Sequence, residues 1–384
     1  MANSFAVMRG CKVVMKQYWT KQRIWLLIFL MIIGIGALLF TSHNERFYQQ
    51  PIAKVISEKT LSKQKVKDQF ANVDHQYNQQ LQVKLMNGKY RGQHLTVQNT
   101  YSDSQPMDQH YRVGNKIFLT QLRKRGGKLT ANINGYKRDT VTVFLLWIVI
   151  LMLLLLMGRS GLFAFLSVVI NAILFLVAIE IDLKQNGQHI MLLFSTLAII
   201  FTFISLLLVL GFSKRMLATF AATVIGTFVA LGVSLLIFTW THERGIYYES
   251  MEYVTQVPRP LFLAETLLGS LGAVMDESSD IIATLFELKQ LDPAVTRKRL
   301  FISGRNVGKS IMGPLINVLF LIFMVDTFTG SLLYIKNGNS WGYTYAMNMS
   351  LGTIQSLISG IGIVISIPLV SLFGALLLGK KAQR

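Results

Sequence analysis

The sequence has little of the charge that a soluble domain of its length carries on its surface. Only 15% of its 384 residues are charged, whereas 52% are apolar. Ordinary globular chains contain about 25% charged residues. This shortage excludes an ordinary soluble domain and predicts a protein whose main contact is with a lipid bilayer.

Cysteine is nearly absent as well. Cys11 is the only one, so the chain cannot form an internal disulfide, and a metal site built on thiolates is excluded. The histidines show no metal-ligand spacing, and His242-Glu243 is followed by "RGIYY" rather than by the second histidine of a zinc protease. We therefore expect no metal site and no cofactor.

Long apolar runs are the abundant feature. Eight of them have about the 17 to 25 residues needed to cross a bilayer. They are residues 24–40, 141–157, 162–179, 189–212, 216–240, 261–286, 307–328 and 351–378. The sequence thus predicts an all-α polytopic membrane protein: a first helix, then a seven-helix bundle over 141–379.

The short loops predict the orientation, because cytoplasmic loops are rich in Lys and Arg. The basic segment 1–23, the loop before residue 307 and the C-terminal "KK" then lie on the same side. We expect both termini in the cytoplasm, with 24–40 as an uncleaved signal anchor. The net charge of +19 follows from this topology and does not indicate nucleic-acid binding.

A polar segment, 41–139, separates the first apolar run from the second. Alternation in "LQVKLMNG", "HLTVQN" and "KIFLTQL" predicts strands, with Asn87-Gly88 as a hairpin turn signal. The earlier stretch 58–76 is strongly polar and fits a helix or disorder. We expect a small β-rich extracytoplasmic domain, whose excess of basic residues fits either an anionic lipid or wall polymer or a plain solvated surface.

A stretch resembling a phosphate-binding loop, "SGRNVGKS" from Ser303 to Ser310, is one residue short of G-x-x-x-x-G-K-[ST]. It also precedes an apolar span instead of following a buried strand. We therefore expect no nucleotide to bind.

The sixth apolar run contains acids that a lipid-facing helix does not tolerate. At 100° per residue one stripe collects Glu265, Gly269, Gly272, Asp276, Asp280, Ala283 and Glu287, while Glu277 lies about a quarter turn away. Three acids at mid-span cost roughly 8 to 10 kcal/mol, more than the roughly 3 to 7 kcal/mol that the surrounding apolar residues return. The stripe therefore predicts burial in the bundle, protonation, a bound cation or a water-filled path.

The seventh run has a polar face of its own, with Asn306, Lys309, Ser310, Gly313 and Asn317. Counting from the assumed span ends places Asp280 level with Gly313 and Asp276 level with Asn317, with Lys309 close to Glu287. Small residues at Gly269, Gly272, Gly308 and Gly313 predict a close approach of the two helices.

Other features leave alternatives open. Residues 261–286 also fit an amphipathic helix on the membrane surface, and their acids fit contacts that only hold helices together. Thr219, Thr223 and Thr227 recur at helical spacing, where hydroxyls usually bond their own helix or a neighbour. Gly360, Gly362 and Pro368 predict a kink or a close packing point in the last span, and Pro368 also fits a break in the helix.

Two stretches, "LGSLGAVMDESSDIIATLFELKQLDP" and "RKRLFISGRNVGKSIMGPLINVLFLIF", are similar to the core of the YibE/F-like family of bacterial multipass membrane proteins, here 268–319. The matching positions are Gly272, Ala273, Met275, Asp276, Asp280, Glu287, Gly304, Asn306, Gly308, Met312, Gly313 and Asn317. The chain departs from the pattern at Glu277, Ser278, Lys309, Ser310, Pro314 and Ile316. With its external domain the chain resembles the larger, YibE-type member, and the resemblance implies a second, related membrane subunit.

We expect a transporter or permease-like protein rather than an enzyme. Asp276 and Asp280 would be its proton- or cation-responsive pair, Asn317 their neutral partner, Glu287 with Lys309 a cytoplasmic gate, and Glu265 a further group of the pathway. The alternative is a non-transporting envelope scaffold that binds a partner. An intramembrane aspartyl protease needs aspartates on two facing helices, and the seventh run has none before Asp326.

Overall fold

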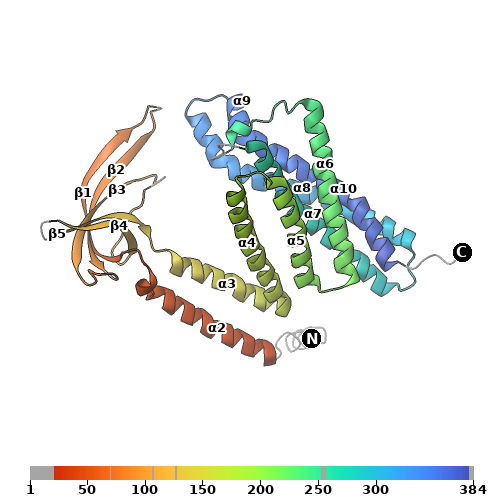
Figure 1. Ribbon diagram of the computed structural model, residues 1–384, viewed down its shortest axis with the longest axis horizontal. Coiled ribbons are helices and arrows are strands. Elements are labelled where there is room, and N and C mark those ends of the chain that lie inside the picture. Colours follow the sequence, from red (N-terminus) through yellow and green to blue (C-terminus); the bar gives the residue numbers. More distant parts are fainter. Residues whose placement is uncertain (1–20, 70, 106–107, 126–127, 252–256, 380–384) are drawn as a thin grey trace, which may run out of the picture. The chain divides into compact units, whose positions relative to one another are not determined.

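The computed structural model describes residues 21–69, 71–105, 108–125, 128–251 and 257–379. Cys11, most of the basic N-terminal segment and the C-terminal "KK" (Lys380 and Lys381) lie outside them. The two basic segments entered the orientation prediction. The chain forms two compact units, Met1–Leu162 and Phe163–Arg384, and each is described by itself (Figure 1).

The first unit contains two apolar helices that pack along each other, α2 (Lys21–Ser42) and α3 (Asp139–Met157). The indole Nε1 of Trp147 on α3 donates to the backbone oxygen of Leu30 at 3.3 Å. Gly34 of α2 lies directly against the Trp147 ring, so a side chain at that position would collide with it. Most other large apolar side chains of both helices are exposed, which is typical of helices in lipid.

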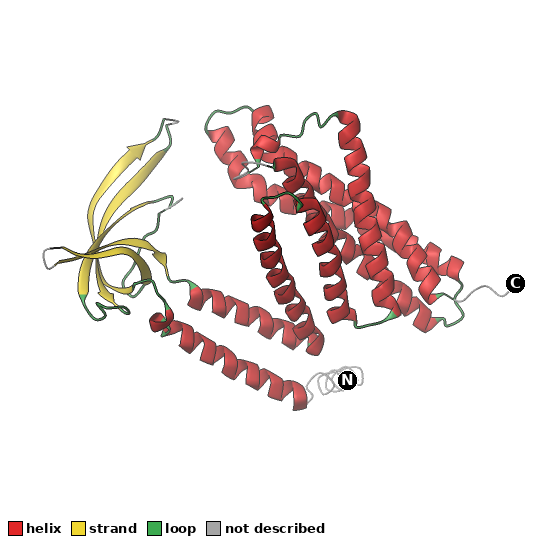
Figure 2. Ribbon diagram, viewed as in Figure 1, coloured by secondary structure: helices red, strands yellow, loops and turns green. Residues whose placement is uncertain are grey.

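Between these helices the chain forms a five-stranded antiparallel sheet (Figure 2). Its strands are β1 (Ile52–Lys67), β2 (Val73–Leu85), β3 (His94–Ser102), β4 (Lys116–Arg125) and β5 (Lys128–Tyr136). Their order is β3-β2-β1-β4-β5, and the two edge strands lie near each other, so the sheet curls towards a barrel. The predicted small β-rich domain is confirmed.

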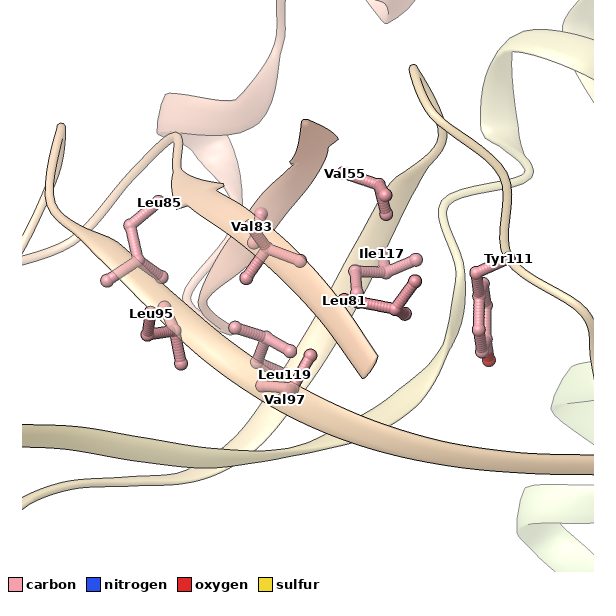
Figure 3. Close-up of a cluster of buried hydrophobic side chains, with 10 residues drawn as sticks. Val55, Leu81, Val83, Leu85, Leu95, Val97, Tyr111, Ile117 and Leu119 are labelled. Atoms are coloured by element: carbon pink, nitrogen blue, oxygen red, sulfur yellow. The ribbon is translucent and has the colours of Figure 1, made fainter. Parts of the chain in front are cut away.

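The sheet encloses an apolar core (Figure 3). Leu81, Val83 and Leu85, predicted to share one strand face, are all buried there. Further members come from other strands and the β3–β4 connection: Val55, Leu95, Val97, Tyr111, Ile117 and Leu119. Alternation along β2 therefore identified the inner face correctly.

The expectation of a helix or disorder over 58–76 is wrong. This stretch forms most of the long β1–β2 hairpin. Its outer part lies beyond the core, so polar side chains occupy both faces and no alternation marks it as a strand. Polar cross-strand contacts stabilise it instead, as where Asn78 Nδ2 donates to Ser62 Oγ at 2.9 Å.

Asn87 and Gly88 do lie in the β2–β3 connection, as predicted, and Gly88 has φ +75°. The connection is longer than a two-residue turn because the Asn87 side chain turns inwards. Its Oδ1 accepts from the amide of Ile52 at 2.7 Å, and its Nδ2 donates to the backbone oxygen of Glu45 at 2.9 Å. Asn87 thus ties the turn to the start of β1.

The second unit is helical. Its elements are α4 (Arg159–Gln185, which begins at the unit boundary), α5 (Ile190–Leu210), α6 (Lys214–Thr241), η2 (Tyr248–Ser250), α7 (Pro258–Leu291), α8 (Arg297–Lys336), α9 (Trp341–Thr344), η3 (Tyr345–Met349) and α10 (Ser350–Leu378). Together with α2 and α3, the described residues give a long helix for each of the eight predicted spans. Seven of these helices are long and apolar enough to cross a membrane. Their number makes the chain a multipass membrane protein, and α7 is the exception because of its acids.

Helix α10 packs against α6, α7 and α8 (Figure 1). Gly304 and Gly308 of α8 lie against Ser371 and Ile367 of α10, and a Cβ at either glycine would come within 2.6 Å of these side chains. Small residues therefore allow the close approach of these helices. The chain remains helical through Pro368, so the predicted break does not occur there.

Candidate functional site

The polar helix α7 is a continuous helix of 34 residues, about 50 Å long. One face packs into the bundle with Phe262, Leu267, Val274, Ile281 and Leu285. It lies beside α6 and α10, both candidate spans, and also contacts α5 and α8. This packing argues against the alternative in which 261–286 lies alone on a membrane surface.

The predicted acidic stripe of α7 lies on the opposite face. Glu265, Asp276, Asp280 and Glu287 are all exposed, and so are the small residues between them. Asp276 and Asp280 are close enough to repel each other electrostatically, and Glu265 interacts in the same way with Asp326 of α8. The structure thus places the stripe on the outer surface of this chain.

Lys309 and Asn317 of α8 are exposed too. None of the six predicted pathway side chains, on α7 or α8, makes a hydrogen bond or ion pair with a described residue. The structure therefore does not join them into one bonded cluster, and the expected pairing of Glu287 with Lys309 is not formed.

The predicted heights on α7 and α8 are wrong by about one turn. Gly308 lies against Ile281, and Gly304 against Leu285. Extending this register along the helices places Asp280 level with Lys309 and Asp276 level with Gly313. The count from the sequence began at assumed span ends, whereas α7 continues to Leu291 and α8 begins at Arg297.

The four glycines predicted to pack α7 against α8 divide into two kinds. A Cβ at Gly308 would meet Ile367 and Ile281, and one at Gly269 would come within 2.8 Å of Gln355 Nε2 of α10. At Gly272 and Gly313 an added Cβ would meet no heavy atom within 4 Å, so neither marks a close helix approach. The tight contact of this bundle is with α10.

Sequence reasoning missed the acid that the bundle buries. Glu277 is 0% exposed and its Oε2 accepts a hydrogen bond from Ser366 Oγ of α10 at 2.5 Å. Its Oε1 has no hydrogen-bond partner among the described residues. The signal was present in the sequence, because Glu277 shares its helix face with the apolar Val274 and Ile281.

The loop-like motif Ser303–Ser310 lies entirely within α8. A continuous helix does not present the converging backbone N–H groups that a phosphate loop uses. In the described part of the chain, no group of three or more His, Cys, Asp or Glu residues could hold a metal ion.

In the first unit the buried charges are paired where α2, the sheet and α3 meet. The Lys137 side chain is 1% exposed, and its Nζ contacts Asp139 Oδ1 at 2.7 Å and the backbone oxygen of Thr41 at 2.5 Å. Lys116 similarly bonds Glu45. Burial raises the pKa of Glu45, but the hydrogen bond and positive charge of Lys116 outweigh it, and the net pKa lies below its ordinary value.

The sheet also has a basic hollow of about 670 Å³. Val55, Leu85 and Met86 contribute apolar atoms to it, and Lys54, Lys84 and Arg91 contribute positive charge. Such a lining suits an anionic ligand with an apolar part.

Comparison with known families now identifies the chain. Residues 145–380 match the YibE/F-like protein family, and residues 46–136 match the YibE/F family N-terminal domain. The chain belongs to the YibE/F-like family. In this YibE/F-like protein the N-terminal-domain match covers the sheet, and the larger match covers α4 to α10 with most of α3. No curated protein and no solved structure matches the chain.

Proposed function

We propose that this YibE/F-like protein is a transporter of the bacterial cytoplasmic membrane, with both termini in the cytoplasm. Its polar pathway would run along the exposed face of α7. One observation carries the proposal: four acids lie on the outer surface of a helix that packs beside two membrane-spanning helices. A charged group at mid-bilayer costs several kcal/mol against lipid.

A second membrane subunit would cover this face. The four acids are exposed in the single chain, so water and a protein partner together would replace lipid there. The partner would be a related YibE/F-like protein, and the pathway would form at the interface between the two. Asp276 and Asp280 would be its proton- or cation-responsive pair. The positive charge of Lys309, level with Asp280, would set the electrostatic potential around them.

A second function is favoured by the basic hollow. Lys54, Lys84 and Arg91 would hold an anionic envelope component, and the helices would serve only as an anchor. In that non-transporting scaffold the α7 stripe would meet its partner without water. Removing residues 41–139 would abolish a scaffold's function, whereas a transporter would keep part of its flux.

Flux in native membrane vesicles tests the proposal without knowledge of the substrate. Vesicles from the natural host cells are loaded with sodium and a pH dye, and exchange of radioactive sodium and proton movement are recorded. We expect wild-type vesicles to move at least one of these ions faster than vesicles containing Asp276→Asn. Equal rates for both would contradict transport through the stripe.

Glu180→Gln is the matched control. It removes another exposed carboxylate, but from α4, where Glu180 pairs with Lys184 at 2.9 Å. Its vesicles should behave like wild type, because that exposed pair lies outside the proposed pathway.

A further inference from the structure

The interior of the bundle holds polar atoms that the proposed pathway does not use. Thr223 and Thr227 of α6, together with Glu277 and Ser278 of α7, are all 0% exposed. Each has a side-chain oxygen without a hydrogen-bond partner among the described residues. Buried oxygens are normally hydrogen-bonded, so four such atoms on two adjoining helices need an explanation.

Other buried hydroxyls of the bundle donate to a backbone oxygen of their own helix, which Thr223 and Thr227 do not do. Thr202 donates to Ala198 O at 2.8 Å, and Thr266 donates to Phe262 O at 2.7 Å. Thr219, one turn before Thr223, also bonds its own helix, through Arg215 O at 3.0 Å. The sequence expectation that the α6 threonines bond their own helix or a neighbour is therefore correct for Thr219, whereas Thr223 and Thr227 bond neither among the described residues.

Helix contacts place Thr223 and Glu277 at one height. A Cβ on Gly226 of α6 would lie 3.4 Å from Val274 and 3.3 Å from Ser366. Helix α6 runs antiparallel to α7, so a step back of three residues on α6 matches a step forward of three on α7. Because Gly226 lies against Val274, Thr223 lies level with Glu277. Ser366 bonds Glu277 at this height, so the three helices meet there.

Among the described residues, no cation pairs with Glu277. Helices α5 and α10 contain no charged residue, and α6 has only Lys214 and Arg215. Arg215 is eight residues from Thr223, about 12 Å along the helix, and its guanidinium lies over the Phe286 ring at 4.0 Å. Lys309 of α8 is exposed, as are Asp276 and Asp280 on the other face of α7.

We propose that Glu277 binds a sodium ion together with the hydroxyls of Thr223, Thr227 and Ser278. A buried carboxylate without a counter-ion is costly, and one bound cation would neutralise it while giving the hydroxyl oxygens a partner. A single carboxylate matches a monovalent charge, whereas calcium sites use more oxygen ligands and zinc sites use nitrogen or sulfur. The inference rests on the proposed function, to which it adds the coupling ion.

Equilibrium binding of radioactive sodium to the purified full-length protein tests the site. We expect saturable binding of one ion per chain. Glu277→Gln, which keeps the side-chain shape, should weaken it by about tenfold or more. Thr223→Val should weaken it less, and it tests the site even if the Glu277 variant is not recovered. Thr266→Val is the matched control, because it removes an equally buried hydroxyl that bonds its own helix.

Two results overturn the inference. If the wild type shows no saturable sodium binding, the carboxyl is simply protonated. If sodium binds but both site variants bind as wild type does, the ion lies elsewhere. Binding and flux are independent: sodium binding without flux contradicts the transporter alone, and proton flux without sodium binding contradicts this site alone.

Discussion

Acids that are wholly or partly buried have opposite surroundings in the two units of this protein. In the first unit Glu45 pairs with Lys116, and Asp139 with Lys137. In the bundle Glu277 is more deeply buried than either, and its one bonded partner among the described residues is the neutral hydroxyl of Ser366. A buried charge that is paired within the chain needs no ligand to offset its desolvation, whereas an unpaired one is explained by a proton or ion from outside.

The outer surfaces of the two units also differ. The sheet exposes lysines and glutamines around an apolar core, as a domain in water does. The bundle exposes large apolar side chains along most helices, whereas one stripe of α7 exposes acids instead. The four exposed acids of α7 therefore depart from the pattern expected of a lipid-facing helix.

The largest effect is expected from the buried pair at the sheet junction. Lys137→Met leaves Asp139 without its cation and should destabilise the first unit by about 3 to 5 kcal/mol. Hydrogen exchange of the β1 and β4 amides in the full chain measures this, and exchange should become about a hundredfold faster or more.

Lys184→Met provides the comparison for that experiment. It breaks an ion pair whose side chains are 73% and 69% exposed, so stability should change by less than about 1 kcal/mol. Equal effects of the two variants would show that pairing at the junction does not stabilise the unit.

A smaller effect is expected from Lys116→Met, about 1.5 to 3 kcal/mol, with a pH signature. The folded pKa of Glu45 is lowered, so its contribution is complete above about pH 4.5 and is lost as the pH falls through the folded pKa. Unfolding temperatures of the full chain between neutral and acidic pH should fall less steeply for this variant than for Lys59→Met, which removes an exposed lysine. Parallel curves would show that Lys116 does not lower the pKa of Glu45.

The sequence predicted the parts of the molecule in which the pattern of apolar and polar residues matches the burial of their side chains. Eight apolar runs identified the long helices, and alternation in 81–85 identified the inner face of β2. The sequence pattern failed to predict the β1–β2 hairpin, because strands that extend beyond a core show no alternation of apolar and polar residues. Chain order alone also did not reveal the helix register, since α7 and α8 extend past their apolar parts.

The candidate site shows the same limit. The acidic stripe could be drawn from helical periodicity, but periodicity does not say which face is buried. Glu277 was set aside because it lies off the stripe, and that position places it among Val274, Ile281 and Leu285 on the packed face. A search for acids on the apolar face of α7 would have found it.

The most direct test of the central claim is whether water reaches the α7 stripe. Single cysteines at Asp280, Ala283, Ser278 and Val325 are introduced into a Cys11→Ser chain in native membranes. Each is then treated with a membrane-impermeant thiol reagent, which needs a hydrated thiolate.

The account predicts reaction at positions 280 and 283 of the stripe. It predicts none at buried Ser278 or at Val325, an apolar α8 side chain that is 74% exposed and would face lipid. Silence at all four positions would mean that the stripe is dry and held by a partner, and that result would contradict a transport pathway along α7.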